Sequence, residues 1–317
     1  MSVRISFVPA FFIIFALNVN VITKTIKPMK LSGRRESTNV DDRRGMRSTA
    51  KMGGLGIGGL IIVALITFAT GGNLGDVINN TGLLEGNVME QAEGGREFTA
   101  EEQELATFSK QILAGTEDVW AQEFKKLGRT YEPPKMVLYT GSVQTACGNG
   151  QSSMGPFYCS ADQCLYIDLS FFSSMKQQLG ADGDFAYAYV IAHEVGHHVE
   201  YLLGTLGKAH EQMSRLNEKE ANKVSVRLEL LADFYAGVWA YHDNKMFGSL
   251  EDGDLEEAIR CAQVIGDNYL QEKARGYSQP ETFTHGTSKQ RMKWLKLGLS
   301  TGDITRGTTF QCSDAEL

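Results

Sequence analysis

The chain has 317 residues, of which 42% are hydrophobic, so it can bury a sizeable core and global disorder is excluded. Five cysteines are too few for a fold built from disulfides. The net charge is −7, but residues 52–317 alone carry 35 acidic and 21 basic side chains. This excess of negative charge repels the phosphates of nucleic acids, so we expect no nucleic-acid binding.

Two apolar runs precede the acidic part of the chain. The first, Ile5–Thr23, has 19 uncharged residues. This run is either a signal-type segment or a second membrane span. A third interpretation is a misassigned start codon, with Met29 as the true start. We treat residues 1–28 as an N-terminal extension. The second run has 24 uncharged residues, 52–75, long enough to cross about 30 Å of hydrocarbon. We predict a transmembrane helix over 53–72 rather than a buried core helix, because the run has no amphipathic stripe.

The charges around the second run predict a topology. Residues 24–51 carry nine Lys or Arg side chains and three acidic ones. Basic residues beside a span stay in the cytoplasm, so residues 29–52 are expected there and the rest beyond the membrane. Residues 73–97, rich in Gly and Asn, predict a linker to a folded domain over 98–317. We expect a single-pass protein of the cytoplasmic (inner) membrane with an extracytoplasmic domain. The sequence defines no oligomeric state.

The remaining periodicity predicts a helix-rich α+β domain with a small sheet. The predicted helices cover 99–127, 184–203, 217–242, 255–271 and 288–297. Alternating residues predict short strands at 136–139 and 164–169. Residues 145–163, rich in Gly, Ser and Cys, predict a loop.

The helix predicted over 184–203 contains an HExxH pattern at His193, Glu194 and His197. Positions i and i+4 share one face of a helix, so both imidazoles can bind one tetrahedral ion. Glu194, about 100° around the helix, can reach a water at the ion without being a ligand. This spacing is typical of zinc hydrolysis. The alternative is a pair of core histidines bonded to their neighbours.

Zinc needs a third protein ligand, and the next long helix offers two carboxylates. Glu229 and Asp233 are also i and i+4, within an apolar segment. We predict that Glu229 binds the metal and that Asp233 accepts the free ring N–H of a ligand histidine. The reverse assignment and a solvated or Arg-paired Glu229 are alternatives. Glu218 and Glu220 lie in a polar stretch and are the next candidates.

Several motifs occur in the order seen in one family. They are GRRESTNVDDRRG from Gly33, ACG and GPFYC around Cys147 and Cys159, YID at Tyr166, HEVGHH, LELLADFYAGVW and THGTSKQR. The chain from residue 29 onward resembles the bacterial putative neutral zinc metallopeptidase family, a membrane-anchored branch of the gluzincin-like enzymes. The resemblance implies a zincin-like domain with one Zn²⁺ ion, ligands His193, His197 and Glu229, and the base Glu194. Residues 1–28, Cys164 and Cys261 lie outside the pattern.

Other residues carry weaker hypotheses. His285, in a polar loop, and Tyr235 are possible oxyanion stabilisers, although helix capping and core packing explain them equally well. A disulfide between Cys147 and Cys159 would contribute about 3 kcal/mol in the loop-entropy model and needs an oxidising compartment. Cys261 and Cys312 are a possible second pair.

These observations predict a membrane-anchored zinc metallopeptidase. A metal-activated water with Glu194 as general base would hydrolyse a peptide or protein substrate. The alternatives are an inactive metal-binding scaffold on the same fold and a metallo-amidase acting on cell-wall material.

Overall fold

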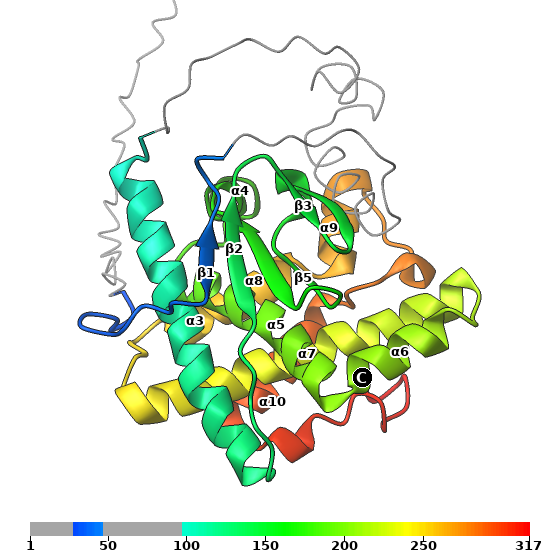
Figure 1. The fold of residues 1–317 in the computed structure, drawn as a ribbon. Coiled ribbons are helices and arrows are strands. Elements are labelled where there is room, and N and C mark those ends of the chain that lie inside the picture. Colours follow the sequence, from blue (N-terminus) through cyan, green and yellow to red (C-terminus); the bar gives the residue numbers. More distant parts are fainter. Residues whose placement is uncertain (1–27, 47–96) are drawn as a thin grey trace, which may run out of the picture.

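The computed structural model describes residues 28–46 and 97–317 (Figure 1). Within these two ranges no helix combines the length and apolar character needed to span a bilayer. The predicted transmembrane helix over 53–72, and the extension over 1–28 except its last residue, lie outside the described residues.

The described residues form the helix-rich α+β fold that the sequence predicts. The helices are α3 (Ala100–Lys126), α4 (Ser170–Ser174), α5 (Asp184–Leu203), α6 (Thr205–Met213), α7 (Glu218–Phe247), α8 (Asp254–Val264), α9 (Asp267–Arg275) and α10 (Ser288–Thr301). The strands are β1 (Val40–Asp42), β2 (Lys135–Tyr139), β3 (Ser142–Thr145), β4 (Gly148–Gln151), β5 (Phe157–Cys159) and β6 (Cys164–Asp168).

Two small sheets are present among the described residues. Four strands pair in the order β1-β2-β6-β5, with β1, β2 and β6 parallel and β5 antiparallel to β6. Val40 lies opposite Met136, which lies opposite Leu165 on its other side. β3 and β4 form a separate antiparallel hairpin.

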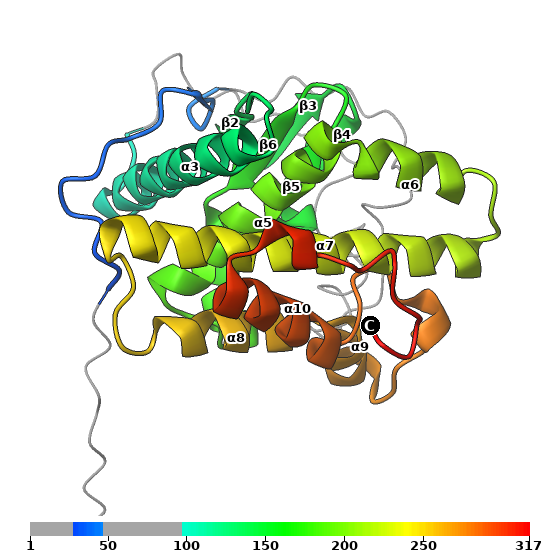
Figure 2. The same cartoon turned by 90° about the horizontal axis from the view of Figure 1, so that it is seen from below.

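The elements stack in layers (Figure 2). The sheets and α3 lie on one side, α5 and α7 in the middle, and α8 and α10 on the far side. α7 packs against α5 on one face and α10 on another, and α5 also contacts α8 and α3. The central parts of the two middle helices are therefore buried, and side chains between them are shielded from solvent.

Local signals fix where the two middle helices begin and end. The Asn217 side chain accepts a hydrogen bond from the Glu220 amide and caps the start of α7. α5 and α7 end at Gly204 and Gly248, which have positive φ of 80° and 60°. Glycine takes this left-handed conformation with little strain, so both helices stop there.

Several parts of the chain differ from the sequence expectations, and α4 and β3 were not predicted. The predicted loop 145–163 contains β4 and β5, which are too short to show alternation. The helix predicted over 255–271 is two helices, because the chain breaks at Gly266, where a Cβ atom would lie 2.3 Å from the Ser288 amide nitrogen. α6 was not predicted.

Residues 28–46 belong to the domain that was expected to begin at residue 98. β1 extends the sheet beside β2, and Met29 and Leu31 are buried. The Arg34 guanidinium binds Asp243 of α7 through bonds of 2.9 and 2.6 Å. Residues 28–46 and 97–317 therefore pack together as one folded unit, whereas the sequence predicted that the basic segment lies apart from the domain.

Candidate metal centre

The HExxH residues lie on the buried face of α5. His193 and Glu194 are 7% and 8% exposed, and the His197 side chain is 12% exposed. One turn apart, the two imidazole rings pack edge to face with centroids 4.9 Å apart. Both rings can therefore reach the same point beside α5.

Glu229 of α7 approaches both histidines. Its Oε2 lies 3.2 Å from His193 Nε2, and its Oε1 lies 3.6 Å from His197 Nε2. One donor atom of each of the three residues lies within 4.8 Å of the others, a spacing that one ion can bridge. The sequence predicted these three residues as ligands, and the structure brings them together.

Gly196, inside the HExxH motif, permits this approach. A Cβ atom there would lie 2.9 Å from the Ala232 carbonyl oxygen of α7 and 3.0 Å from its Cα. Any larger residue would separate the two helices. The glycine thus sets the distance between the histidines of α5 and the carboxylate of α7.

The outward-facing nitrogen of each ring is held by a second carboxylate. His193 Nδ1 lies 2.8 Å from Asp233 Oδ1, and His197 Nδ1 lies 2.9 Å from Glu200 Oε2. Burial opposes protonation of His193, but Asp233 and Glu229 outweigh it and raise its pKa to about 10. A bound metal would replace the Nε2 protons, and the Nδ1 bonds would then hold both rings with Nε2 toward the ion. Two imidazoles and one carboxylate form a donor set that fits catalytic zinc, which keeps its fourth position open.

Asp233 belongs to a buried network. It is fully buried and accepts bonds of 2.8 Å from Arg291 Nε and Nη2 and one of 2.5 Å from the Tyr189 hydroxyl. Arg291 is on α10, which approaches α7 closely because Gly298 faces the Phe234 carbonyl. The network locks the carboxylate that orients His193.

The charged side chains of the site shift one another's pKa values. Burial alone would raise the pKa of Asp233, but Arg291 outweighs it and lowers the pKa to about 2. Burial also opposes ionisation of Glu229, but His285 and the two ligand histidines hold its pKa well below the ordinary value. Both carboxylates are therefore ionised at neutral pH, as metal binding requires. Burial raises the pKa of Glu194, which favours its accepting a proton.

The two possible oxyanion stabilisers, His285 and Tyr235, lie in different surroundings. Burial would lower the pKa of His285, but the negative charge of Glu229 raises it, so His285 interacts electrostatically with the third ligand. Its ring Nδ1 lies 3.3 Å from Asp267 Oδ1. Tyr235 is 5% exposed, with its ring edge to face against Trp120, which agrees with the core-packing alternative.

Sequence reasoning missed three residues of the site. Glu200 lies three residues after His197, a spacing that places it on the same face of α5. Tyr189 lies four residues before His193 and has the same relation. Arg291 ends the THGTSKQR motif, but no spacing rule connects it with Asp233 of α7. Only the packing of α10 on α7 brings them together.

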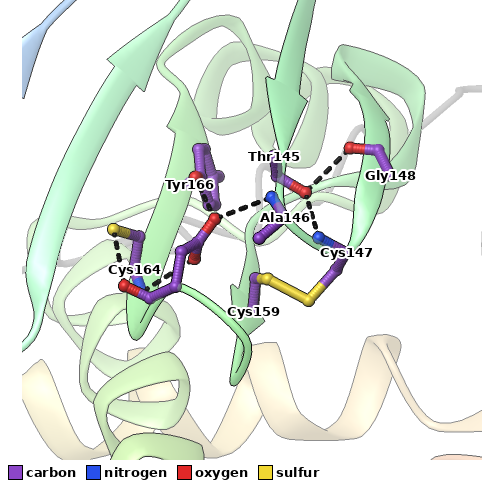
Figure 3. The surroundings of a disulfide bond; sticks show 8 residues. Thr145, Ala146, Cys147, Gly148, Cys159, Cys164 and Tyr166 are labelled. Atoms are coloured by element: carbon purple, nitrogen blue, oxygen red, sulfur yellow. Dashed lines mark hydrogen bonds between the residues drawn. A yellow bond between two sulfur atoms is a disulfide. The ribbon is translucent and has the colours of Figure 1, made fainter.

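One predicted disulfide is present beside the sheet (Figure 3). Cys147 and Cys159 are bonded, with Cα atoms 5.8 Å apart. Cys261 and Cys312, the possible second pair, are both free, and Cys261 Sγ is buried 3.6 Å from Met175 Sδ. Cys164 lies opposite Cys159 in the sheet, with its sulfur pointing away from the disulfide.

The family comparison covers this whole constellation. The model of the family described as "Putative neutral zinc metallopeptidase" matches residues 29–310, so the chain belongs to this family. The matched range takes in nearly all of residues 28–46 and every residue of the candidate metal centre.

Two relatives to which the chain is similar are uncharacterized proteins. The chain is 49% identical over 288 residues to the uncharacterized protein YpfJ of Escherichia coli (strain K12), covering 89% of this chain and 99% of that protein. It is 41% identical over 201 residues to the uncharacterized protein Rv2575 of Mycobacterium tuberculosis (strain H37Rv), covering 60% and 67%. No solved structure matches the chain significantly.

Proposed function

We propose that this protein is a zinc-dependent peptidase with a zincin-like fold, in which His193, His197 and Glu229 hold one Zn²⁺ ion. The observation that carries the proposal is the orientation of the two rings. Each Nδ1 is bonded to a buried carboxylate, and each Nε2 faces Glu229. A structural pair of core histidines would not need two Nε2 atoms directed at a third carboxylate.

The residues around this point divide the work of hydrolysis. Bound zinc supplies Lewis acidity, which polarises the substrate carbonyl and acidifies the attacking water. Glu194 accepts the proton of that water and delivers it to the leaving amine. Asp233 and Glu200 fix the orientation of the two ligand imidazole rings. We also propose His285, whose backbone amide and ring Nδ1 are held by Asp267, as the oxyanion donor.

A hollow beside the N-terminal half of α7 supports a peptide substrate. It has a volume of about 360 Å³ and is lined in part by Val226, Phe283 and Gly286. Val226 precedes Glu229 by one turn of α7, so the hollow opens on the same helix face as the third ligand. An apolar side chain of a peptide could bind there while its backbone reaches Glu194.

We also propose a location outside the cytoplasm. The disulfide between Cys147 and Cys159 supports an oxidising compartment. Because β1 pairs with β2, residues 28–46 would share that compartment with 97–317. The apolar residues 53–72 would be the contact with the lipid bilayer.

Substrate degradation by the purified, zinc-loaded protein tests the proposed activity. We expect it to cleave casein or a mixture of peptides, and we expect a chelator to stop cleavage and added zinc to restore it. Cleavage of peptidoglycan alone would indicate the amidase alternative. Stoichiometric zinc without turnover of either substrate would indicate the inactive scaffold.

A further inference from the structure

A second group of carboxylates lies at the other end of α5, about 13 Å along the helix from His193. Asp184 begins α5, and Asp254 and Glu257 belong to the first turns of α8. One oxygen of each lies within 4.8 Å of the others. Asp254 is fully buried and Glu257 is 8% exposed, so water screens the repulsion between these carboxylates only weakly.

The polar contacts of the group leave negative charge uncompensated. Its side chains accept bonds from the backbone amides of Met29, Glu251 and Phe185. Within residues 28–46 and 97–317, no lysine or arginine forms a salt bridge with any of the three carboxylates. Asp254 Oδ1 is buried without any hydrogen-bond partner. A buried carboxylate oxygen of this kind is costly unless a cation or proton satisfies it.

A charge balance indicates the valence of the missing partner. When all three carboxylates are ionised, they contribute −3. The amide ends of α5 and α8, which begin at Asp184 and Asp254, each contribute about +0.5. The remainder is about −2, which one divalent cation neutralises.

The backbone around the group is shaped for these side chains. Gly183, just before Asp184, has φ of 115° and lies against the Glu257 carboxylate, so that a Cβ atom would be 2.1 Å from it. Only glycine allows Glu257 to reach the group at this position. Gly183 thus leaves the space that the Glu257 carboxylate occupies, and this carboxylate is not a solvated surface charge.

We propose that Asp184, Asp254 and Glu257 bind one Ca²⁺ ion. Oxygens up to 4.8 Å apart can share one Ca²⁺, whose bonds are about 2.3–2.6 Å long. Mg²⁺ generally uses one or two carboxylates and keeps several waters, which suits this buried group less well. Zinc prefers nitrogen and sulfur donors, which the group lacks. The ion would tie the beginning of α5 to α8 and to the segment around Met29.

The acidity of the group agrees with this assignment. Burial and neighbouring carboxylates raise the pKa of Asp254 to about 6 and that of Glu257 to about 7. A bound divalent cation would remove this penalty and displace any protons.

Isothermal titration of the full zinc-loaded chain with CaCl₂ at pH 7.5 to 8 tests the proposal. We expect one Ca²⁺ per chain, and we expect Asp254→Asn to weaken binding at least about tenfold. Asp252→Asn is the matched control, because Asp252 is two residues away and exposed. It should bind Ca²⁺ like the unmodified chain. Glu257→Gln is the second variant if Asp254→Asn does not fold, as judged by circular dichroism.

Two results would overturn the assignment. One is the absence of saturable binding up to about 10 mM Ca²⁺, beyond the range of weak extracellular sites. The other is equal Ca²⁺ affinity in Asp254→Asn and Asp252→Asn, which would place the ion elsewhere. A Glu229→Gln variant that loses zinc but still binds Ca²⁺ would support a separate site, whatever the outcome for peptidase activity.

Discussion

Gly196 of α5 and Ala232 of α7 meet so closely that a Cβ atom on the glycine would lie 2.9 Å from the Ala232 carbonyl oxygen. This contact lies between the ligand histidines on one helix and Glu229 and Asp233 on the other. The spacing of the HExxH motif brings two ligands together within α5. The small residue inside the motif brings the third from α7.

We therefore expect Gly196→Ala to damage the metal centre from a position that binds no metal. The added methyl must push α5 and α7 apart, which should cost about 1–3 kcal/mol of unfolding free energy and weaken zinc binding. Gly207→Ala in α6 is the control, because nothing lies within 4 Å of its Cβ position. Urea unfolding and zinc titration measure both effects. Unchanged zinc affinity in Gly196→Ala would mean that the helix spacing does not set the site.

The sequence predicted the elements that carry a strong local signal. α5 begins and ends at the predicted residues, and Glu229 reaches the histidines as the i and i+4 spacings suggested. The contacts of Arg291 and of β1 could not be predicted, because each joins segments far apart in the chain. Arg291 is 58 residues from Asp233, and Val40 pairs with a strand almost a hundred residues later.

The two carboxylates of α7 should differ in their effect on metal content. Glu229→Ala removes a ligand and should abolish stoichiometric zinc binding. Asp233→Ala removes no ligand, but it removes the support of His193 and the partner of Arg291, and it should weaken affinity or activity by about 10–100-fold. Zinc per mole by atomic spectroscopy, alongside circular dichroism, distinguishes them. If Asp233→Ala loses zinc while Glu229→Ala retains it, the two roles are reversed. If neither loses it, the third ligand is elsewhere.

Asp233 should also make the metal-free protein sensitive to acid. Its folded pKa is about 2, below the ordinary 3.8, so its contribution is present above pH 4 and is lost as the pH falls toward 2. A shift of this size corresponds to roughly 2 kcal/mol. Between about pH 5 and pH 3, the unfolding free energy of Asp233→Asn should fall less steeply than that of the unmodified chain. Parallel slopes would show that Arg291 does not stabilise the charged form.

The shared sheet makes a prediction about compartments. Single cysteines introduced by Lys30→Cys and Lys208→Cys, in a chain with Cys164, Cys261 and Cys312 changed to serine, should react alike with a membrane-impermeant maleimide in intact spheroplasts. Both should be labelled if the disulfide forms outside the cytoplasm. Labelling at only one position would contradict the pairing of β1 with β2.

The most direct test of the proposed mechanism is Glu194→Gln. The amide has the same shape but cannot accept the proton of the attacking water. We expect this variant to bind zinc like the unmodified chain and to lose peptide hydrolysis, whereas Glu218→Gln, at an exposed position of α7, retains both. Zinc content and peptide cleavage should be measured on the same preparations. Full peptidase activity in zinc-loaded Glu194→Gln would contradict the assignment of Glu194 as the general base.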